Sequence, residues 1–176
     1  MKTRSVVHAR FGRLLTGVIL LGAVAFGRAD AAPDPRFEQL KSLAGNWVGK
    51  AGFGEPNEPT TVSYRVTAGG TAVIEVQFEG TTHEMTTVYH MDGENLMLTH
   101  YCAAGNQPRM RALPSDNPAV LRFDFLDGTS MKPLDGHMHA AMIKFDGPDH
   151  LLATWYHYDK GKPAAEAKFD LTRVKE

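Results

Sequence analysis

From residue 46 to the C-terminus, apolar and polar residues alternate in short runs separated by turn-forming residues. Alternation with a period of two is typical of β-strands that bury one face. In the run from Thr60 to Val66, for example, Val62, Tyr64 and Val66 share a face. The pattern predicts ten strands, at residues 46–53, 60–66, 72–79, 84–91, 95–103, 109–113, 120–126, 137–145, 151–158 and 165–174.

Short turns join these runs. Gly69-Gly70 allows positive φ at both central positions of a hairpin, and no helical stretch separates one run from the next. Parallel pairing needs crossovers of about a dozen or more residues, so the strands must be antiparallel. We therefore predict an all-β, antiparallel up-and-down barrel of about ten strands, which removes its edges by closing. Further turns are expected at Asp92-Gly93, Asn117-Pro118, Asp127-Gly128, Asp146-Gly147-Pro148 and Lys160-Gly161.

A short helix is predicted ahead of the first strand. Asp34 can cap it and Pro35 suits its first position, while Phe37, Leu40 and Leu43 recur at helical spacing. We expect this helix to plug one end of the barrel.

The third predicted strand has apolar residues at alternate positions. Its interior face is assigned to Ala72, Ile74, Val76 and Phe78. Glu75, Gln77 and Glu79 are then expected to face water. Because inward positions carry almost no Asp or Glu, a hydrolase that uses paired carboxylates is improbable.

The first 31 residues have the three parts of a secretory signal peptide. Lys2, Arg4, Arg10 and Arg13 precede a 13-residue apolar run at 14–26, and Ala29-Asp30-Ala31 supplies a cleavage site. The run is too short to span a bilayer, although an uncleaved anchor is the alternative. We expect a signal peptide at 1–31, a tether and helix at 32–45 and the barrel at 46–176. The mature protein would be periplasmic or secreted, with no membrane insertion after cleavage.

The net charge limits the classes of partner, and the single cysteine limits how the domain can be stabilised. Removal of the leader leaves 14 basic and 19 acidic residues, a net charge of about −5 with neutral histidines. Nucleic acids and anionic membranes favour clustered Lys and Arg, so neither is an expected partner. Cys102 is the only cysteine, so the domain has no internal disulfide and depends on core burial. A buried, inert thiol is the expected state of Cys102.

The sequences of the first and last predicted strands resemble motifs of a known family of barrels. Gly45-Asn46-Trp47 resembles the Gly-x-Trp signature of lipocalin and wider calycin barrels, and Leu43-x-Gly45-x-Trp47-x-Gly49 is similar to the opening of nitrobindin-like haem-binding barrels. Phe169-Asp170-Leu171-Thr172-Arg173-Val174 looks like a closing strand that returns Arg173 to stack on Trp47. The segment 99–110 looks like a motif of exported bacterial proteins with no assigned activity. The resemblance implies a calycin-like container.

The leading functional hypothesis is a barrel that binds a small apolar or amphipathic ligand, with no demonstrable catalysis. The expected cavity lining is Tyr64, Phe78, Tyr89, His100, Phe123 and Phe125. Asn106, Gln107 and Arg109 are expected at the rim, where they could clamp a carboxylate or phosphate or only tie the loop to its neighbours. No catalytic motif is present, so an enzyme of unknown reaction is the weakest alternative.

Histidines give a second alternative, a haem- or metal-binding barrel. A two-residue turn at Asp92-Gly93 would place Met85 opposite His100 and His83 opposite Cys102. His100 is then either a haem or metal ligand or a buried histidine that hydrogen-bonds a neighbour.

A His-x-His pair adds to this alternative. His137 and His139 share a face about 7 Å apart, in reach of one metal, and are expected to point inward. A metal site needs three or four ligands, so packing is the simpler interpretation. The candidate ligands are His83, His100, His137 and His139.

Overall fold

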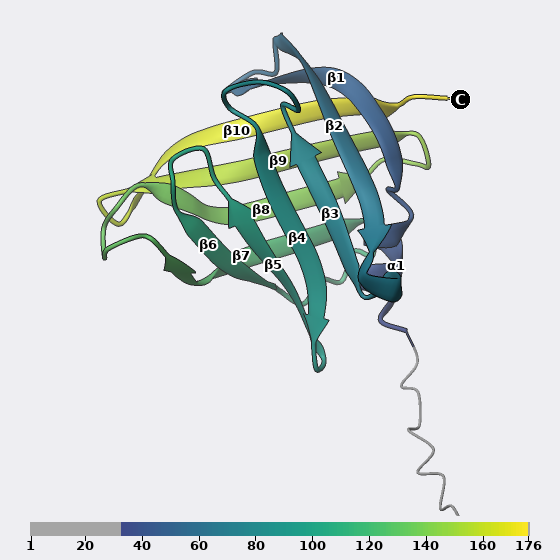
Figure 1. Cartoon of the computed structure of the whole chain (residues 1–176), viewed down its shortest axis with the longest axis horizontal. Coiled ribbons are helices and arrows are strands. Elements are labelled where there is room, and N and C mark those ends of the chain that lie inside the picture. Colours follow the sequence, from purple (N-terminus) through teal and green to yellow (C-terminus); the bar gives the residue numbers. More distant parts are fainter. Residues whose placement is uncertain (1–32, 176) are drawn as a thin grey trace, which may run out of the picture. The chain divides into compact units, whose positions relative to one another are not determined.

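Ten antiparallel strands close into a barrel in the computed structural model (Figure 1), which describes residues 33–175. Each strand pairs with the next along the chain, and β1 also pairs with β10. The predicted signal peptide lies outside the described residues. Within 33–175, no helix has the length and apolar character needed to cross a membrane. The elements are α1 (Pro35–Lys41), β1 (Gly45–Phe53), β2 (Glu58–Thr67), the 3-10 turn η1 (Ala68–Gly70), β3 (Ala72–Gln77), β4 (Met85–Asp92), β5 (Asn95–Tyr101), β6 (Gln107–Ala112), β7 (Val120–Thr129), β8 (His137–Phe145), β9 (His150–Asp159) and β10 (Lys162–Arg173).

The short helix α1 closes one end of the barrel, as predicted (Figure 1). The Asp34 carboxylate accepts hydrogen bonds from the backbone N–H groups of Arg36 and Phe37 at 2.8 and 3.4 Å. These bonds satisfy donors that the first helical turn leaves unpaired. The side chains of Phe37 and Leu40 are buried in the barrel core.

Pairing of the first and last strands confirms the predicted closure. Trp47 lies opposite Arg173 in the β1–β10 register, and the guanidinium carbon lies 4.3 Å from the indole ring centre. Arg173 also donates hydrogen bonds of 2.8 Å to the carbonyls of Ser42 and Ala44. The chain entering β1 is thereby tied to the chain leaving β10.

The face assignment of β3 was wrong. Glu75 and Gln77 are buried at 2% exposure each, whereas Ile74 and Val76 are only half-buried. Residues directly opposite each other in an antiparallel pair point to the same face. Glu75 lies opposite Tyr64, whose side chain is inside, and so it must point inward too.

Phe78 follows β3 and still points inward, as expected. Its φ of 55° breaks the alternation and turns the side chain back toward the interior. The apolar residues of this segment therefore lie on both faces of the sheet, with Ile74 and Val76 on the outer face and Phe78 on the inner one. An alternation with a period of two does not reveal such a change.

The β4–β5 register differs from the predicted one by two residues. Asp92 pairs with Asn95, so the turn is Gly93-Glu94, and Thr87 instead of Met85 lies opposite His100. His83 falls in the loop before β4 and is not paired with Cys102. A shift of two keeps every side chain on its face, and His100 is therefore still inside.

Candidate ligand cavity

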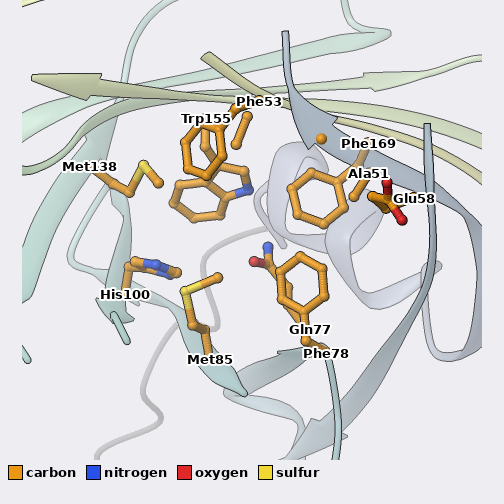
Figure 2. Close-up of a pocket in the computed structure, with 12 residues that line it drawn as sticks. Ala51, Phe53, Glu58, Gln77, Phe78, Met85, His100, Met138, Trp155 and Phe169 are labelled. Carbon is orange, nitrogen blue, oxygen red and sulfur yellow. The ribbon is translucent and has the colours of Figure 1, made fainter. Parts of the chain in front are cut away.

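The half of the barrel away from α1 contains a cavity of about 190 Å³. It lies where β1 and β3 end and where β4 and β8 begin, between strands far apart in the sequence (Figure 2). Apart from Glu58, Gln77 and His100, the lining consists of apolar side chains and glycine. The full lining is Ala51, Gly52, Phe53, Glu58, Gln77, Phe78, Met85, His100, Met138, Trp155, Ala167 and Phe169.

A wider pocket of about 540 Å³ lies at the barrel mouth and shares residues with the inner cavity. Phe53, Glu58, Phe78, Met85 and Met138 line both spaces, so a ligand could extend from one into the other. Methionine side chains adapt their shape readily, which suits residues at such a passage. The remaining mouth residues are Pro59, Thr81, His83, Cys102, Ala103, Ala104 and His157.

His100 is the most unusual polar group of the inner cavity. It is 1% exposed, and its ring lies against Trp155 with 4.5 Å between ring centres. Nδ1 is 2.9 Å from the Thr87 hydroxyl, whereas Nε2 has no hydrogen-bond partner within residues 33–175. Burial lowers the pKa of His100 from 6.5 to about 4, so the ring is neutral at pH 7. An unpaired buried polar group costs about 1–3 kcal/mol, and native proteins contain few of them.

Gln77 connects the cavity to a buried carboxyl group. The Gln77 amide donates a 2.7 Å hydrogen bond to Glu75, and the Tyr89 hydroxyl donates one of 2.5 Å to the same carboxyl. Because its NH2 group is used in this way, Gln77 presents its carbonyl oxygen to the cavity (Figure 2). Burial raises the pKa of Glu75, while the hydrogen bonds from Tyr89 and Gln77 lower it in part.

The two tyrosines beside Glu75 stabilise the closed half of the barrel. Tyr64 and Tyr89 are buried, and burial next to Glu75 raises the pKa of both hydroxyls. Tyr89 packs against Phe123 with ring centres 5.8 Å apart, and Tyr64 contacts Trp47 edge-on. These rings fill the space between α1 and the cavity.

The predicted lining residues therefore divide into two groups. Phe78 and His100 line the inner cavity. Tyr64, Tyr89 and Phe123 belong to the solid core instead, and Phe125 packs against His137 and His139. The prediction placed these six residues around one space, but a barrel plugged by a helix is filled at that end.

The His-x-His pair does not point into the cavity. A β-bulge between Met138 and Ala140 shifts the alternation of β8, and Met138 takes the cavity position. His137 and His139 hydrogen-bond each other at 3.0 Å, and His139 stacks on Tyr158 with 4.0 Å between ring centres. Burial and the neighbouring His137 lower the pKa of His139. Across the described residues, no group of three or more His, Cys, Asp or Glu is arranged to hold a metal.

The three predicted rim residues make contacts within the barrel wall. Asn106 is buried and donates a 2.8 Å hydrogen bond to the carbonyl of Gly136, and Gln107 accepts one of 2.7 Å from Thr129. Arg109 forms a bidentate ion pair with Asp127. None of the three is among the residues that line the cavity or its mouth. Their geometry matches the alternative in which these groups tie the loop to its neighbours.

Trp155, Met138 and Gln77 line the cavity but were not identified as site residues from the sequence. Trp155 alternates with Leu151 and Ala153 in a predicted strand, so a signal for its inward position was present. Gln77 could have been found by pairing its strand with the preceding one through the Gly69-Gly70 turn. Met138 depends on a bulge, for which the local sequence gives no signal.

Comparison with known proteins supports the fold. No protein-family model and no curated protein matches the chain. Among solved structures it is similar to Rv2717c from Mycobacterium tuberculosis, with a TM-score of 0.56 and 19% identity over 81% of this chain and 99% of that one. It is also similar to a protein of unknown function from the DUF3598 family of Nostoc punctiforme, with a TM-score of 0.53 and 16% identity over 77% of this chain. The match spans about half of that second protein, 49% of its length.

Proposed function

We propose that the barrel binds a small, largely apolar molecule in the inner cavity, and that the mouth pocket holds any part of the ligand that extends toward solvent. The observation that carries this proposal is an apolar cavity inside a closed wall of strands, whose lining includes a buried nitrogen, Nε2 of His100, without a hydrogen-bond partner among the described residues. Apolar walls with few polar groups are typical of small-molecule sites. A calycin-like barrel, as the sequence resemblance implies, is an architecture that suits this role.

The size of the cavity limits what it can hold. An engineered cavity of about 150 Å³ in another protein stays dry and binds benzene. A cavity of about 190 Å³ therefore suits a single ring or a short branched chain. A longer ligand would have to extend into the mouth pocket past the residues that line both spaces, which include Met85 and Met138.

Toluene is a suitable first probe because it has the size of one ring and no hydrogen-bonding group. A ligand that binds only the native state raises the melting temperature, and the rise grows with the logarithm of ligand concentration above the dissociation constant. We expect toluene to raise the melting temperature of the protein and to give a dissociation constant by calorimetry. A folded protein that shows no saturable binding up to the solubility limit of toluene would contradict the proposal.

Two variants on β10 separate cavity binding from binding elsewhere. Ala167 lines the cavity, so Ala167→Leu should fill part of it and weaken toluene binding by about tenfold or more. Ala164 is exposed on the same strand, and Ala164→Leu should leave the affinity unchanged. Equal affinities of the two variants for toluene would place the binding site outside this cavity.

A haem-binding barrel is the second candidate, and the mouth pocket favours it because His83 and His157 both line that pocket. His100 does not fit this role, since the cavity around it is smaller than the roughly 300 Å³ at which pockets for drug-sized ligands begin, and a haem is larger than such ligands. Histidine is a common axial ligand of haem iron. Reconstitution with haem should give a Soret band that His83→Ala or His157→Ala abolishes, and a missing band would remove this candidate.

Export is proposed from the leader sequence. If residues 1–31 are a signal peptide, the protein would meet its ligand outside the cytoplasm. N-terminal sequencing of the protein from an expressing cell should show Ala32 as the first residue, and an intact Met1 in the exported fraction would contradict cleavage.

A further inference from the structure

The chemistry of the cavity wall narrows the ligand class, given the proposed binding function. Nε2 of His100 is a buried nitrogen without a partner in residues 33–175, and His100 lines the cavity. Figure 2 shows its ring beside Met85 and Met138, below Trp155. A ligand group that pairs with this nitrogen would remove the free-energy cost of leaving a buried polar atom without a hydrogen bond.

The hydrogen bond to Thr87 decides what kind of group that is. Thr87 is fully buried, and its hydroxyl makes this one side-chain hydrogen bond within the described residues. If Nδ1 carried the proton, the Thr87 hydroxyl hydrogen would be left unpaired. If the hydroxyl donates to Nδ1 instead, the proton of the neutral ring is on Nε2. His100 then offers an N–H donor.

A second donor faces the same space. Figure 2 shows the indole nitrogen of Trp155 turned toward the middle of the cavity, and an indole N–H can only donate. The His100 ring packs against Trp155 at an angle of 36° between the ring planes, and this contact holds the two rings relative to each other. Two N–H donors, from His100 and Trp155, therefore face the cavity beside the one acceptor that Gln77 presents, so an acceptor oxygen of a ligand would find donors there.

Electrostatics exclude an anionic acceptor. No Lys or Arg is among the described residues that line the cavity, and Glu58 at its edge is acidic. Glu75 lies directly behind Gln77. A carboxylate placed here would lose its hydration without gaining a cation, which is strongly unfavourable.

We infer that the ligand is an uncharged molecule of about one ring that carries a carbonyl-type oxygen, and that this oxygen accepts a hydrogen bond from Nε2–H of His100. The proposal rests on the proposed function and adds the polar group that the ligand must carry. The rest of the ligand contacts the apolar side chains of Phe78, Met85 and Phe169.

A matched pair of ligands tests the acceptor. Acetophenone and α-methylstyrene have nearly the same shape, but one has C=O where the other has C=CH2. One net hydrogen bond corresponds to about a two- to tenfold difference in dissociation constant. Calorimetry at pH 7 should therefore show acetophenone binding about two- to tenfold more tightly, with no detectable binding of benzoate at the same concentrations.

A double variant tests the donor. Thr87→Val combined with His100→Phe replaces both hydrogen-bonded partners by apolar groups of similar shape, a change that a core tolerates better than loss of one partner. This variant should bind α-methylstyrene as the wild type does and lose its preference for acetophenone. His90→Phe, a histidine substitution on β4 outside the cavity lining, should keep the preference.

If the double variant does not fold, nitrogen NMR of the wild type gives the same information. Acetophenone should shift the His100 Nε2 resonance, and α-methylstyrene should not.

The outcomes separate this inference from the proposed function. Equal affinities for the two ligands, tighter binding of benzoate, or a retained preference in the double variant would overturn the inference while leaving apolar binding intact. If neither ligand binds the folded wild type, the proposed function fails.

Discussion

Loss of the Arg173 guanidinium should destabilise the barrel through its contacts at the junction of the first and last strands. The guanidinium lies 4.3 Å from the Trp47 ring centre and donates hydrogen bonds to the carbonyls of Ser42, Ala44 and Pro148. These carbonyls are accessible enough for water to replace part of each bond. We therefore expect Arg173→Ala to lower the free energy of unfolding by about 1–3 kcal/mol.

Trp47→Ala should lower the free energy of unfolding by more, about 3–5 kcal/mol, because the indole is 1% exposed and its removal leaves a cavity. The two losses share one contact. The double variant should therefore lose less than the sum of the single losses, by about 0.5–2 kcal/mol, the range of a cation–π interaction. Arg173→Lys should lie between wild type and alanine, since it keeps the charge and loses the planar fork.

Urea denaturation followed by far-UV circular dichroism measures the wild type and all four variants without depending on indole fluorescence. Arg122, exposed on β7, provides a control, and Arg122→Ala should change the free energy of unfolding by less than about 0.5 kcal/mol. Additive losses for Trp47 and Arg173 would show that the stacked geometry contributes no stability and would refute this reasoning.

Three further predictions concern protonation and packing. The native pKa of His100 is about 4 against 6.5 in the unfolded chain, so the unfolded state takes up the proton first as pH falls from 6.5 toward 4. Over that window, the wild type should lose roughly 3 kcal/mol of stability relative to the Thr87→Val/His100→Phe variant in denaturation curves. His150 has the opposite dependence: hydrogen bonds to Asp170 and Asp146 raise its pKa, so its stabilising contribution is present below pH 6.5 and is lost as pH rises through the native pKa. His150→Asn should therefore reduce the melting temperature at pH 5.5 and hardly change it at pH 9, and an equal reduction at both would contradict the linkage. Gly49→Ala should destabilise the folded protein by about 2 kcal/mol or more. The reason is that a Cβ at this position would lie 2.0 Å from the Asp170 carbonyl oxygen in the β1–β10 pairing. A melting temperature equal to that of the wild type would rule this out.

The local sequence determined the number of strands, their direction and the closure of the barrel. Alternation and hairpin turns act over fewer than ten residues, so they can be seen without any knowledge of neighbours. The capped helix before β1 has a local signal as well. Trp47 and Arg173 are 126 positions apart, and their contact was expected from the family resemblance of the first and last strands, not from local alternation.

Which residues face the cavity was decided by tertiary structure. In β3 both alternating sets contain apolar residues, and only the pairing of Glu75 with the inward Tyr64 settles the face. In β8 a bulge moves Met138 to the interior in place of the two histidines. A bulge or a change of partner changes a side chain's face without changing the local pattern.

The position of the cavity along the barrel axis also required the assembled structure. Tyr64, Tyr89 and Phe123 have the same strand pattern as the residues that line the cavity, but they lie in the half closed by α1 and fill it. The pairing of His100 with Thr87, and the unpaired nitrogen that results, depend on the register of two strands and on the packing of Trp155 from a third. The sequence determines which side chains can point inward, and contacts between distant strands determine which of them surround an empty space.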